Sequence, residues 1–333
     1  KKFTEKFKIN VEDVRKKNTS RFSQYKSISI LPEPYFNSLK YAGATNLNLD
    51  PFDAKLRAAN DLIGYNGNFY PTIALETYLK YNNTDKVTLT DKYLIVDKTG
   101  LKIPIYISIG NVKHKIKFYR FKDNSEYSHT KYSAIDIINS VKLIREGKKP
   151  IISPSEFDNK IVIIGANALS LQDAHDTSIS LNHPGVDIQA TILNNFLSND
   201  FLIRFPNILN IAIILLLSVL TFTAIRFLTF IQSLMSLVLV AVLYFIFCLI
   251  CFNNNTIPLV ITPLAVQLST MIFGYSYRFI LEGKNKEKIK NAMGKYLSQD
   301  IMKNVVQNID DIKLGSKKAN VTVLFADIRG FTS

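Results

Sequence analysis

The sequence predicts an α/β domain over residues 1–204, followed by a membrane region over residues 205–281 and then a tail. Two observations carry this prediction. Short β-branched runs and segments with helical spacing occur in the first part, whereas the apolar residues from about 208 to 280 form blocks too long for a soluble core. Both cysteines, Cys248 and Cys251, lie in those blocks, so no disulfide framework holds the first domain and its own core must stabilise it.

Five elements are expected within the first domain. Residues 26–31 and 160–167 are β-branched runs, which suit strands buried on both faces of a sheet. Helical spacing of apolar residues predicts three helices, over residues 70–81, 133–147 and 185–200. The last of these helices leads to the membrane region.

Three apolar blocks in the membrane region are each close to the ~20 residues that a helix needs to cross the hydrocarbon. These blocks are residues 208–225, 234–252 and 257–277. They should be helical because the bilayer core offers the backbone no water for hydrogen bonding. Pro258 and Pro263 predict a kink or a late start in the third block.

The basic side chains that flank the blocks predict the orientation. Residues 278–295 are rich in Lys and Arg and the loop 226–233 carries an arginine, whereas the loop 253–256 carries no charge. Basic flanks favour the cytoplasm, so the tail is expected inside and residues 1–204 outside. The chain is therefore expected to be a multi-pass protein of the inner (plasma) membrane, in contact with membrane lipid.

The formal charge of +14 does not indicate a nucleic-acid partner. Nucleic-acid binding needs basic residues gathered on one face, with aromatic side chains for stacking. Here the lysines are scattered among asparagines and isoleucines along the whole chain. No nucleic acid is therefore expected among its partners.

The last residues carry a different chemistry. A strand is expected over Val321–Ala326, and Asp327 follows at its carboxyl end. Mg²⁺ accepts carboxylates and carbonyl oxygens beside substrate phosphates. The amides of Gly330, Phe331 and Thr332 would lie near the N-terminus of the next helix, where anions bind. A nucleoside triphosphate needs this combination, although a single aspartate after a strand is commonplace.

The stretch "LFADIRGFTS" closely resembles the first strand and turn of class III adenylate/guanylate cyclases, whose domain is α+β and ferredoxin-like. Residues 294–308 resemble the helical segment that commonly precedes that domain. The resemblance implies a helical transmitter over residues 282–319 and the start of a cyclase domain over residues 320–333. It also implies that Asp327 is the first metal-binding carboxylate and that Ile328 gives a backbone carbonyl to the metal.

By the same resemblance, Gly330, Phe331 and Thr332 shape the loop that holds the triphosphate. Two Mg²⁺ or Mn²⁺ ions would assist the conversion of a nucleoside triphosphate, ATP in preference to GTP, into a 3′,5′-cyclic nucleotide and pyrophosphate. Class III sites lie at a dimer interface, which implies a homodimer. The second metal aspartate and the other catalytic residues are expected beyond Ser333, so the fragment alone is expected to be inactive.

Five stretches of the first domain resemble the second class of CHASE sensor domains, which are extracytoplasmic modules of bacterial cyclases and histidine kinases. The stretches are "NFYPTIALETYL" (68–79), "YSAIDII" (132–138), "FDNKIVIIGANA" (157–168), "DAHDT" (173–177) and "GVDIQATILNNFL" (185–197). The resemblance implies a bacterial receptor whose outside domain senses an unknown signal. Two alternatives stay open: a sensor histidine kinase with the same sensor, and a non-catalytic receptor with a degenerate cyclase domain.

Within the sensor, Asp173, His175 and Asp176 form the one metal-like cluster of the sequence, in a loop after the expected strand at 160–167. Ligands of open α/β sheets bind beyond the carboxyl ends of strands. This loop is therefore the first candidate for a signal site, and the alternative is a solvated loop. The remaining histidines are isolated in the sequence and are expected to be ordinary surface or turn residues: His114, His129 and His183.

Overall fold

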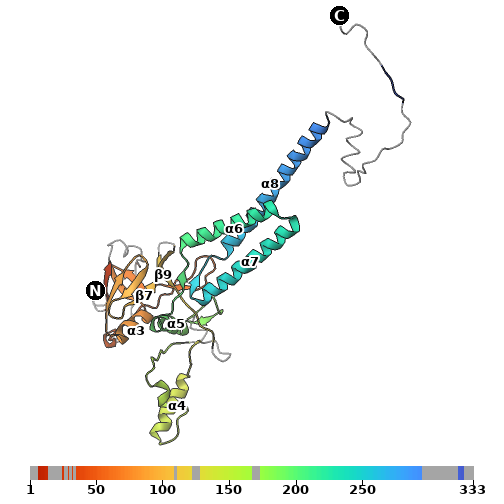
Figure 1. The fold of residues 1–333 in the computed structure, drawn as a ribbon. Coiled ribbons are helices and arrows are strands. Elements are labelled where there is room, and N and C mark those ends of the chain that lie inside the picture. Colours follow the sequence, from red (N-terminus) through yellow and green to blue (C-terminus); the bar gives the residue numbers. More distant parts are fainter. Residues whose placement is uncertain are drawn as a thin grey trace. The chain divides into compact units, whose positions relative to one another are not determined.

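The structure is a computed structural model that describes residues 7–13, 25, 29, 32, 35–108, 111–121, 128–166, 173–294 and 322–325 (Figure 1). Its residues fall into two compact units, and each is described by itself. The first unit comprises Lys1–Asn210 and Leu243–Val260, and the second comprises Ile211–Val242 and Ile261–Ser333. The first unit therefore holds the predicted α/β domain together with the connection between the last two apolar helices.

The largest sheet of the first unit has four strands. In spatial order they are β1 (Asn10–Asp13), β5 (Lys86–Leu89), β6 (Tyr93–Val96) and β7 (Leu101–Pro104). Strands β5, β6 and β7 form an antiparallel meander, and β1 pairs with β5 in parallel. Alternate residues of β5 and β7 are buried, which is the pattern of a sheet with one face on the core. The domain is thus a mixed α/β domain.

A tight hairpin joins β3 (Leu62–Tyr65) to β4 (Asn68–Pro71). Its two turn residues, Asn66 and Gly67, both have positive φ angles, of 47° and 73°. This is the backbone that an Asn-Gly pair favours in a two-residue hairpin. A further small sheet has the spatial order β2 (Ala58–Ala59), β9 (Asn111–Lys115) and β8 (Tyr106–Ser108).

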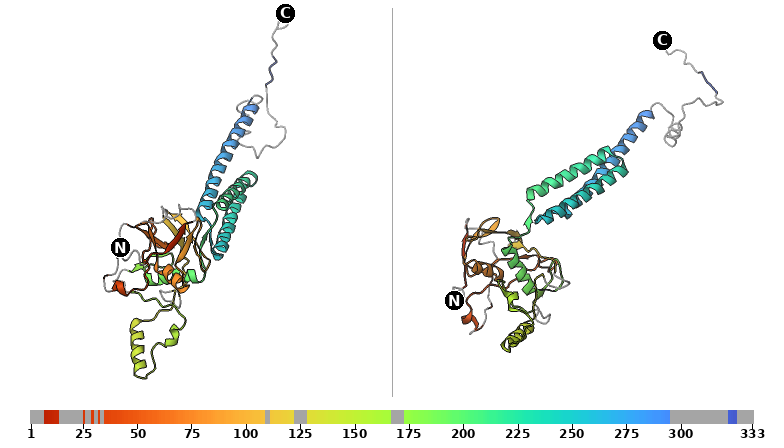
Figure 2. Two further views of the ribbon diagram at one scale, coloured as in Figure 1. Left: turned by 90° about the vertical axis from the view of Figure 1, so that its left-hand side faces the viewer. Right: turned by 60° about the horizontal axis from the view of Figure 1, so that its bottom comes forward.

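The helices α3 (Ile73–Tyr81) and α5 (Gly185–Leu197) confirm the first and third helices predicted for this domain. They pack against each other (Figure 1, Figure 2), and the rings of Tyr78 and Phe196 meet edge to face between them, with centroids 6.0 Å apart. Both helices share one apolar core with the large sheet. That core includes Leu75, Leu79, Val87, Leu89, Leu94, Ile103, Ile188 and Ile192.

The second predicted helix is also confirmed, as α4 (Ala134–Arg145). Gly147, two residues beyond its end, has a φ of 71°, a conformation that glycine adopts freely after a helix. The described part of the first domain also contains short elements, among them α2 (Tyr35–Ser38), the 3₁₀ turn η2 (Pro154–Phe157), β10 (Ala174–His175) and β11 (His183–Pro184).

The predicted strand over residues 160–167 is wrong for the residues that the structure describes. Residues 160–166 lie in neither helix nor strand, and Ile164 is 92% exposed. A strand needs a neighbouring backbone to complete its hydrogen bonds, and none of the described strands pairs with this run. The predicted strand over residues 26–31 lies outside the described residues, apart from Ser29.

Two helices are long and apolar enough to cross a membrane, α6 (Asn207–Phe227) and α7 (Phe230–Asn253). Only 22% and 11% of their most apolar windows are buried, which does not fit the buried core helix of a soluble protein. The apolar blocks at 208–225 and 234–252 are therefore helical, as predicted.

The third apolar block belongs to α8 (Ile261–Met293), which is not among the helices that meet the length and apolarity of a membrane span. The helix begins four residues later than the block because Thr256–Ile257 form a strand, β13, and Pro258 follows it. The late start that the prolines predicted is confirmed. At 1.5 Å per residue this helix is about 50 Å long, so it exceeds the ~30 Å thickness of a hydrocarbon core.

In the second unit, α8 packs against the end of α6. One guanidinium nitrogen of Arg278, Nη1, donates to the carbonyl oxygens of Ile225 and Leu228, each over 3.0 Å. These carbonyls lie at the helix end, where the last acceptors have no partner within the helix. Gly274 permits the close approach, because a Cβ there would lie 2.7 Å from Cδ1 of Ile225. Between α7 and α8, the hydroxyls of Ser233 and Tyr275 share a hydrogen bond.

Residues 322–325 are exposed and lie in neither helix nor strand. The strand predicted over Val321–Ala326 is therefore not formed in its described part, because no described segment supplies the hydrogen bonds of a partner strand. The predicted metal and triphosphate residues all lie outside the described residues, and their roles stay predictions. They are Asp327, Ile328, Gly330, Phe331 and Thr332.

Candidate functional site

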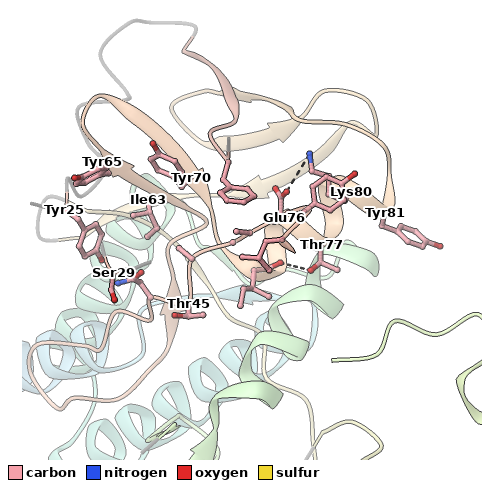
Figure 3. A pocket seen from close by; sticks show the side chains of 18 of the residues that line it. Tyr25, Ser29, Thr45, Ile63, Tyr65, Tyr70, Glu76, Thr77, Lys80 and Tyr81 are labelled. Carbon is pink, nitrogen blue, oxygen red and sulfur yellow. Dashed lines mark hydrogen bonds and ion pairs between the residues drawn. The ribbon is translucent and has the colours of Figure 1, made fainter. Parts of the chain in front are cut away.

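A cavity of about 1050 Å³ opens in the first unit, beside α3 (Figure 3). Its walls come from the β3–β4 hairpin, one side of α3, the segment 39–46 and single residues of other segments, among them Phe7, Tyr25 and Ile161. Several of the lining side chains are aromatic: Phe7, Tyr25, Tyr41, Tyr65, Tyr70 and Tyr81. A concave site with apolar and aromatic side chains and a few placed polar groups is a usual form of a small-molecule pocket.

Residues 39–46 form one wall because their backbone is tied to the start of α3, and we call this segment the strap. The amide of Ala44 donates to the carbonyl of Pro71 over 2.8 Å, and the amide of Ile73 donates back to the carbonyl of Ala44 over 3.0 Å. Gly43 makes this approach possible, because a Cβ at Gly43 would lie 2.6 Å from backbone atoms of Ile73. Glycine is required at position 43 because there is no room for a side chain, and not because of its backbone conformation.

Glu76 is the buried charged group of the cavity. It lies in the middle of α3, is only 8% exposed and lines the pocket. One carboxylate oxygen, Oε1, lies 3.7 Å from Nζ of Lys80, one turn further along the helix. The other oxygen, Oε2, is buried and has no hydrogen-bond partner among the described residues. Burial raises the pKa of Glu76, and the charge of Lys80 opposes that rise.

Lys80 is held at the rim of the same cavity. Besides facing Glu76, its ammonium lies 4.8 Å from the centre of the Tyr41 ring, within the range of a cation–π contact. Figure 3 shows Glu76 and Lys80 joined across one turn of α3, with Thr77 bonded back to the helix. Among the described residues that line the cavity, Glu76 and Lys80 are the charged ones.

The residues at and just beyond the end of α5 form hydrogen bonds with one segment that precedes α6 and with another that follows α7. Asp200, three residues beyond α5, accepts hydrogen bonds from Nζ of Lys117 at 2.7 Å to both carboxylate oxygens. It also accepts one from Nδ2 of Asn255, at 2.8 Å. Asn195, fully buried on α5, bonds the backbone of Lys117 through both its amide atoms. We call these four residues the Asp200 clasp.

A short pair of parallel strands continues the clasp. β12 (Ile203–Arg204), just before α6, pairs with β13, just before α8. The amide of Ile203 donates to the carbonyl of Asn255 over 2.7 Å, which ties the two strands directly to the clasp. The segments that enter α6 and α8 are thus hydrogen-bonded to each other within the first unit.

Three of the histidines that were predicted to be ordinary surface or turn residues are in fact paired with carboxylates. Asp187, in the first turn of α5, contacts two of these histidines. Its Oδ2 lies 2.7 Å from Nε2 of His183, and its Oδ1 lies 2.8 Å from Nδ1 of His129. His114, fully buried, lies 2.9 Å from Asp61. The prediction was wrong because the partners of His114 and His129 are far away in the sequence, whereas the His183–Asp187 spacing of one helical turn was a signal that could have been used.

Burial by itself raises the pKa of Asp187, but hydrogen bonds from His129, His183 and the amide of Ser128 outweigh burial, so that the pKa lies well below its usual range. Asp187 is therefore a stable anion that joins the loop at residues 128–129 to the start of α5. Its aromatic surroundings include Phe118 and Phe121, whose rings contact His183. We read this network as structural, because His183 and Asp187 are almost completely buried.

The residues predicted as a metal-like cluster are described, and each has a separate local role. The carbonyl of Asp173 accepts the amide of Gly185, and Asp176 accepts the amide of Asn182 through Oδ1. His175 pairs with His183 in the antiparallel β10–β11 ladder. Over the described parts of the chain, no group of three or more His, Cys, Asp or Glu side chains could hold a metal ion. A signal site at this loop stays a prediction.

Sequence reasoning missed the cavity. The helical spacing at 70–81 predicted α3 but not the face on which Glu76 would be buried, because the strap that forms one wall lies about 30 residues before α3 in the sequence. Two local signals were available: the Asn66-Gly67 turn, and a glutamate surrounded by apolar residues on a short helix.

Comparison with known proteins gives one match. The family model described as "CHASE2 domain" matches residues 4–223, which is more than half of the chain. No curated protein and no solved structure matches the chain.

Proposed function

This chain belongs to the CHASE2 domain family, and from that membership we propose that it is a membrane signal receptor. CHASE2 is a sensor domain of receptors, and the first unit has the cavity that a sensor of small molecules needs. In the proposal, a signal bound outside the membrane changes the activity of a cytoplasmic class III nucleotidyl cyclase domain.

One observation supports this proposal most directly. The helix that lines the cavity, α3, packs on α5, and α5 leads within three residues to Asp200, which bonds Lys117 and Asn255. A ligand that moves α3 would therefore act on a rigid helix whose end is joined to the segments entering α6 and α8. Packed side chains and hydrogen bonds of this kind are how one site can bias another.

The hydrogen bonds also support the proposed orientation. Asn255 follows α7, and its bond to Asp200 requires the α7–α8 connection to lie in the same compartment as the sensor. Arg278 bonds carbonyls at the end of α6, so the basic flank and the α6–α7 connection share the other side. With α8 as a third span, the sensor is outside and the basic flank is in the cytoplasm, as the charge distribution favours.

The cyclase part of the proposal rests on the stretch from Phe325 to Thr332, which matches the cyclase pattern without a gap. Asp327 and the carbonyl of Ile328 would bind Mg²⁺ or Mn²⁺, and the amides of Gly330, Phe331 and Thr332 would hold the triphosphate of ATP. The bound ions would stabilise charge on the leaving pyrophosphate. Because such sites form between two domains, the receptor would act as a homodimer.

The test replaces Asp327 by Asn in the protein that carries this chain and a complete cyclase domain. The variant should fold normally and produce cyclic nucleotide about two orders of magnitude more slowly, because the ion loses a carboxylate ligand. Asp311→Asn, upstream of the motif, is the matched control and should stay active. Normal production by the Asp327 variant would reject the cyclase assignment, and wild-type protein without activity would favour a degenerate domain.

A further inference from the structure

Glu76 lines the cavity beside α3 and carries an acceptor without a donor. Its Oε2 is buried and has no hydrogen-bond partner among the described residues. A buried carboxylate oxygen without a partner is costly, because it has lost water and gained nothing in return. Such a group needs an explanation, and a ligand that donates a hydrogen bond to it is one. Lys80 does not complete it, since its ammonium faces the other oxygen over 3.7 Å.

We propose that this cavity binds a small organic ligand that carries a protonated amine on an aromatic or apolar body, with the amine donating to the carboxylate of Glu76. This inference rests on the proposed receptor function and names the class of its signal. The cavity volume of about 1050 Å³ suits a small organic molecule rather than a bare ion.

The charges of the lining favour a cation over an anion. Among the described lining residues, Lys80 is the one basic side chain, and it already faces Glu76 and the Tyr41 ring. An anionic ligand would have to compete with both contacts and would approach the buried carboxylate of Glu76. A cation would meet an unpaired oxygen instead, and binding it would favour the ionised form of a carboxyl group whose pKa burial has raised.

The aromatic lining favours the same ligand. The faces of tyrosine rings attract cations and also pack against apolar bodies. In Figure 3, Tyr65 and Tyr70 lie with Ile63 on the hairpin wall, and Glu76 lies on α3. Tyr70 and Ile63 are almost completely buried, so this wall is formed before any ligand arrives. The body of the ligand would pack on this wall while its amine meets Glu76.

The experiment uses three probes with the same phenol body: tyramine, which is cationic, tyrosol, which is neutral, and 4-hydroxyphenylacetate, which is anionic. Binding to the 333-residue chain in nanodiscs is measured by calorimetry. Tyramine should bind at least about tenfold more tightly than either analogue, as a charge-assisted hydrogen bond predicts. Saturable binding of tyramine that is no tighter than that of tyrosol, or absent up to about 10 mM, would overturn the proposal.

Two variants locate the effect. Glu76→Gln should weaken tyramine binding by about tenfold or more and leave tyrosol binding unchanged, because only the charged contact is removed. Lys80→Met should leave tyramine binding equal or stronger, whereas it would abolish binding of an anionic ligand. Glu146→Gln, on the exposed end of α4, is the matched control. Circular dichroism and the unfolding midpoint confirm that each variant is folded.

These outcomes are separate from the test of the receptor. If amine binding fails while Asp327→Asn still abolishes cyclic nucleotide production, the ligand class is wrong and the receptor function stands. Unchanged tyramine affinity in folded Glu76→Gln protein would likewise reject the role of Glu76.

Discussion

Asp200 and Asn255 are joined by a hydrogen bond of 2.8 Å between Oδ1 and Nδ2, although 55 residues and the two most apolar helices separate them in the sequence. The bond ties the end of the sensor domain to the connection that leads into α8. Both carboxylate oxygens of Asp200 are also held by Lys117. Asp200 therefore joins Lys117 to the segment that leads into α8.

Replacing Asp200 by Ala should destabilise the first unit by about 1–3 kcal/mol, because Lys117 and Asn255 lose a partly buried acceptor. The measurement is urea unfolding of the chain in nanodiscs. Glu146→Ala, which breaks the exposed Glu146–Lys148 pair, should cost no more than about 1 kcal/mol. If both substitutions change the free energy of unfolding by the same small amount, the Asp200 clasp does not stabilise the first unit.

Acid should destabilise the sensor domain through Asp187. Its pKa is lower in the folded protein than in the unfolded chain, so its stabilisation is fully present above the unfolded value of about 4 and is lost as the pH falls toward the folded value. Unfolding free energies measured between neutral pH and about pH 3 should fall below about pH 4.

The matched substitution for this effect is Asp187→Ala, which removes the carboxylate that both His129 and His183 face. It should cost about 3–5 kcal/mol at neutral pH, as breaking a buried pair does, and should reduce the dependence on acid. Asp158→Ala, at an exposed position, is the control. Acid sensitivity that is identical in the Asp187 variant would assign the effect to other groups.

Gly43 should not tolerate a side chain. Gly43→Ala would place a Cβ 2.6 Å from the backbone of Ile73, so the strap would have to move away from α3 and open the cavity. Overpacking of this kind costs about 1–3 kcal/mol. Gly283→Ala is the control, because nothing lies within 4 Å of its Cβ and alanine favours a helix. The unfolding temperatures of both variants are measured. If Gly43→Ala does not lower the unfolding temperature, the strap does not need a glycine at this position.

The proposed orientation is tested by labelling. In a Cys248→Ser, Cys251→Ser background, single substitutions Ser155→Cys and Lys286→Cys place thiols at exposed positions of the sensor and of α8. An impermeant maleimide added to intact cells should label Ser155→Cys alone, and lysis should expose the other. Labelling of Lys286→Cys from outside would invert the topology.

The proposed receptor would transmit its signal through α8, and this transmission should depend on the helical phase. Residues 281–292 are exposed, and Ile289 is 60% exposed on this part of the helix, so two copies could pair here in a homodimer. Inserting four residues after Lys288 would rotate the helix face that carries Ile289 relative to the preceding part of α8, whereas inserting seven would nearly restore its direction. Cyclase activity should change severalfold with four and little with seven. A flexible tether would respond weakly and equally to both.

The sequence alone determined the helices. Those at α3, α4, α5, α6 and α7 were predicted because spacing, flanking residues and apolar length are properties of a continuous segment. Even the late start of α8 was foreseeable, since Pro258 and Pro263 act on their immediate neighbours. The sensor family could be predicted as well, because the order of its motifs is written along the chain.

The tertiary structure decided everything that depends on partners distant in sequence. The run at 160–166 has strand composition, but none of the described strands pairs with it. Three histidines that are isolated in the sequence lie beside carboxylates. The cavity that Glu76 lines also depends on the strap, whose residues precede α3 by about 30 positions. The physical reason is the same in each case: hydrogen bonding and burial are satisfied between segments, and which segments meet is not a local property of either one.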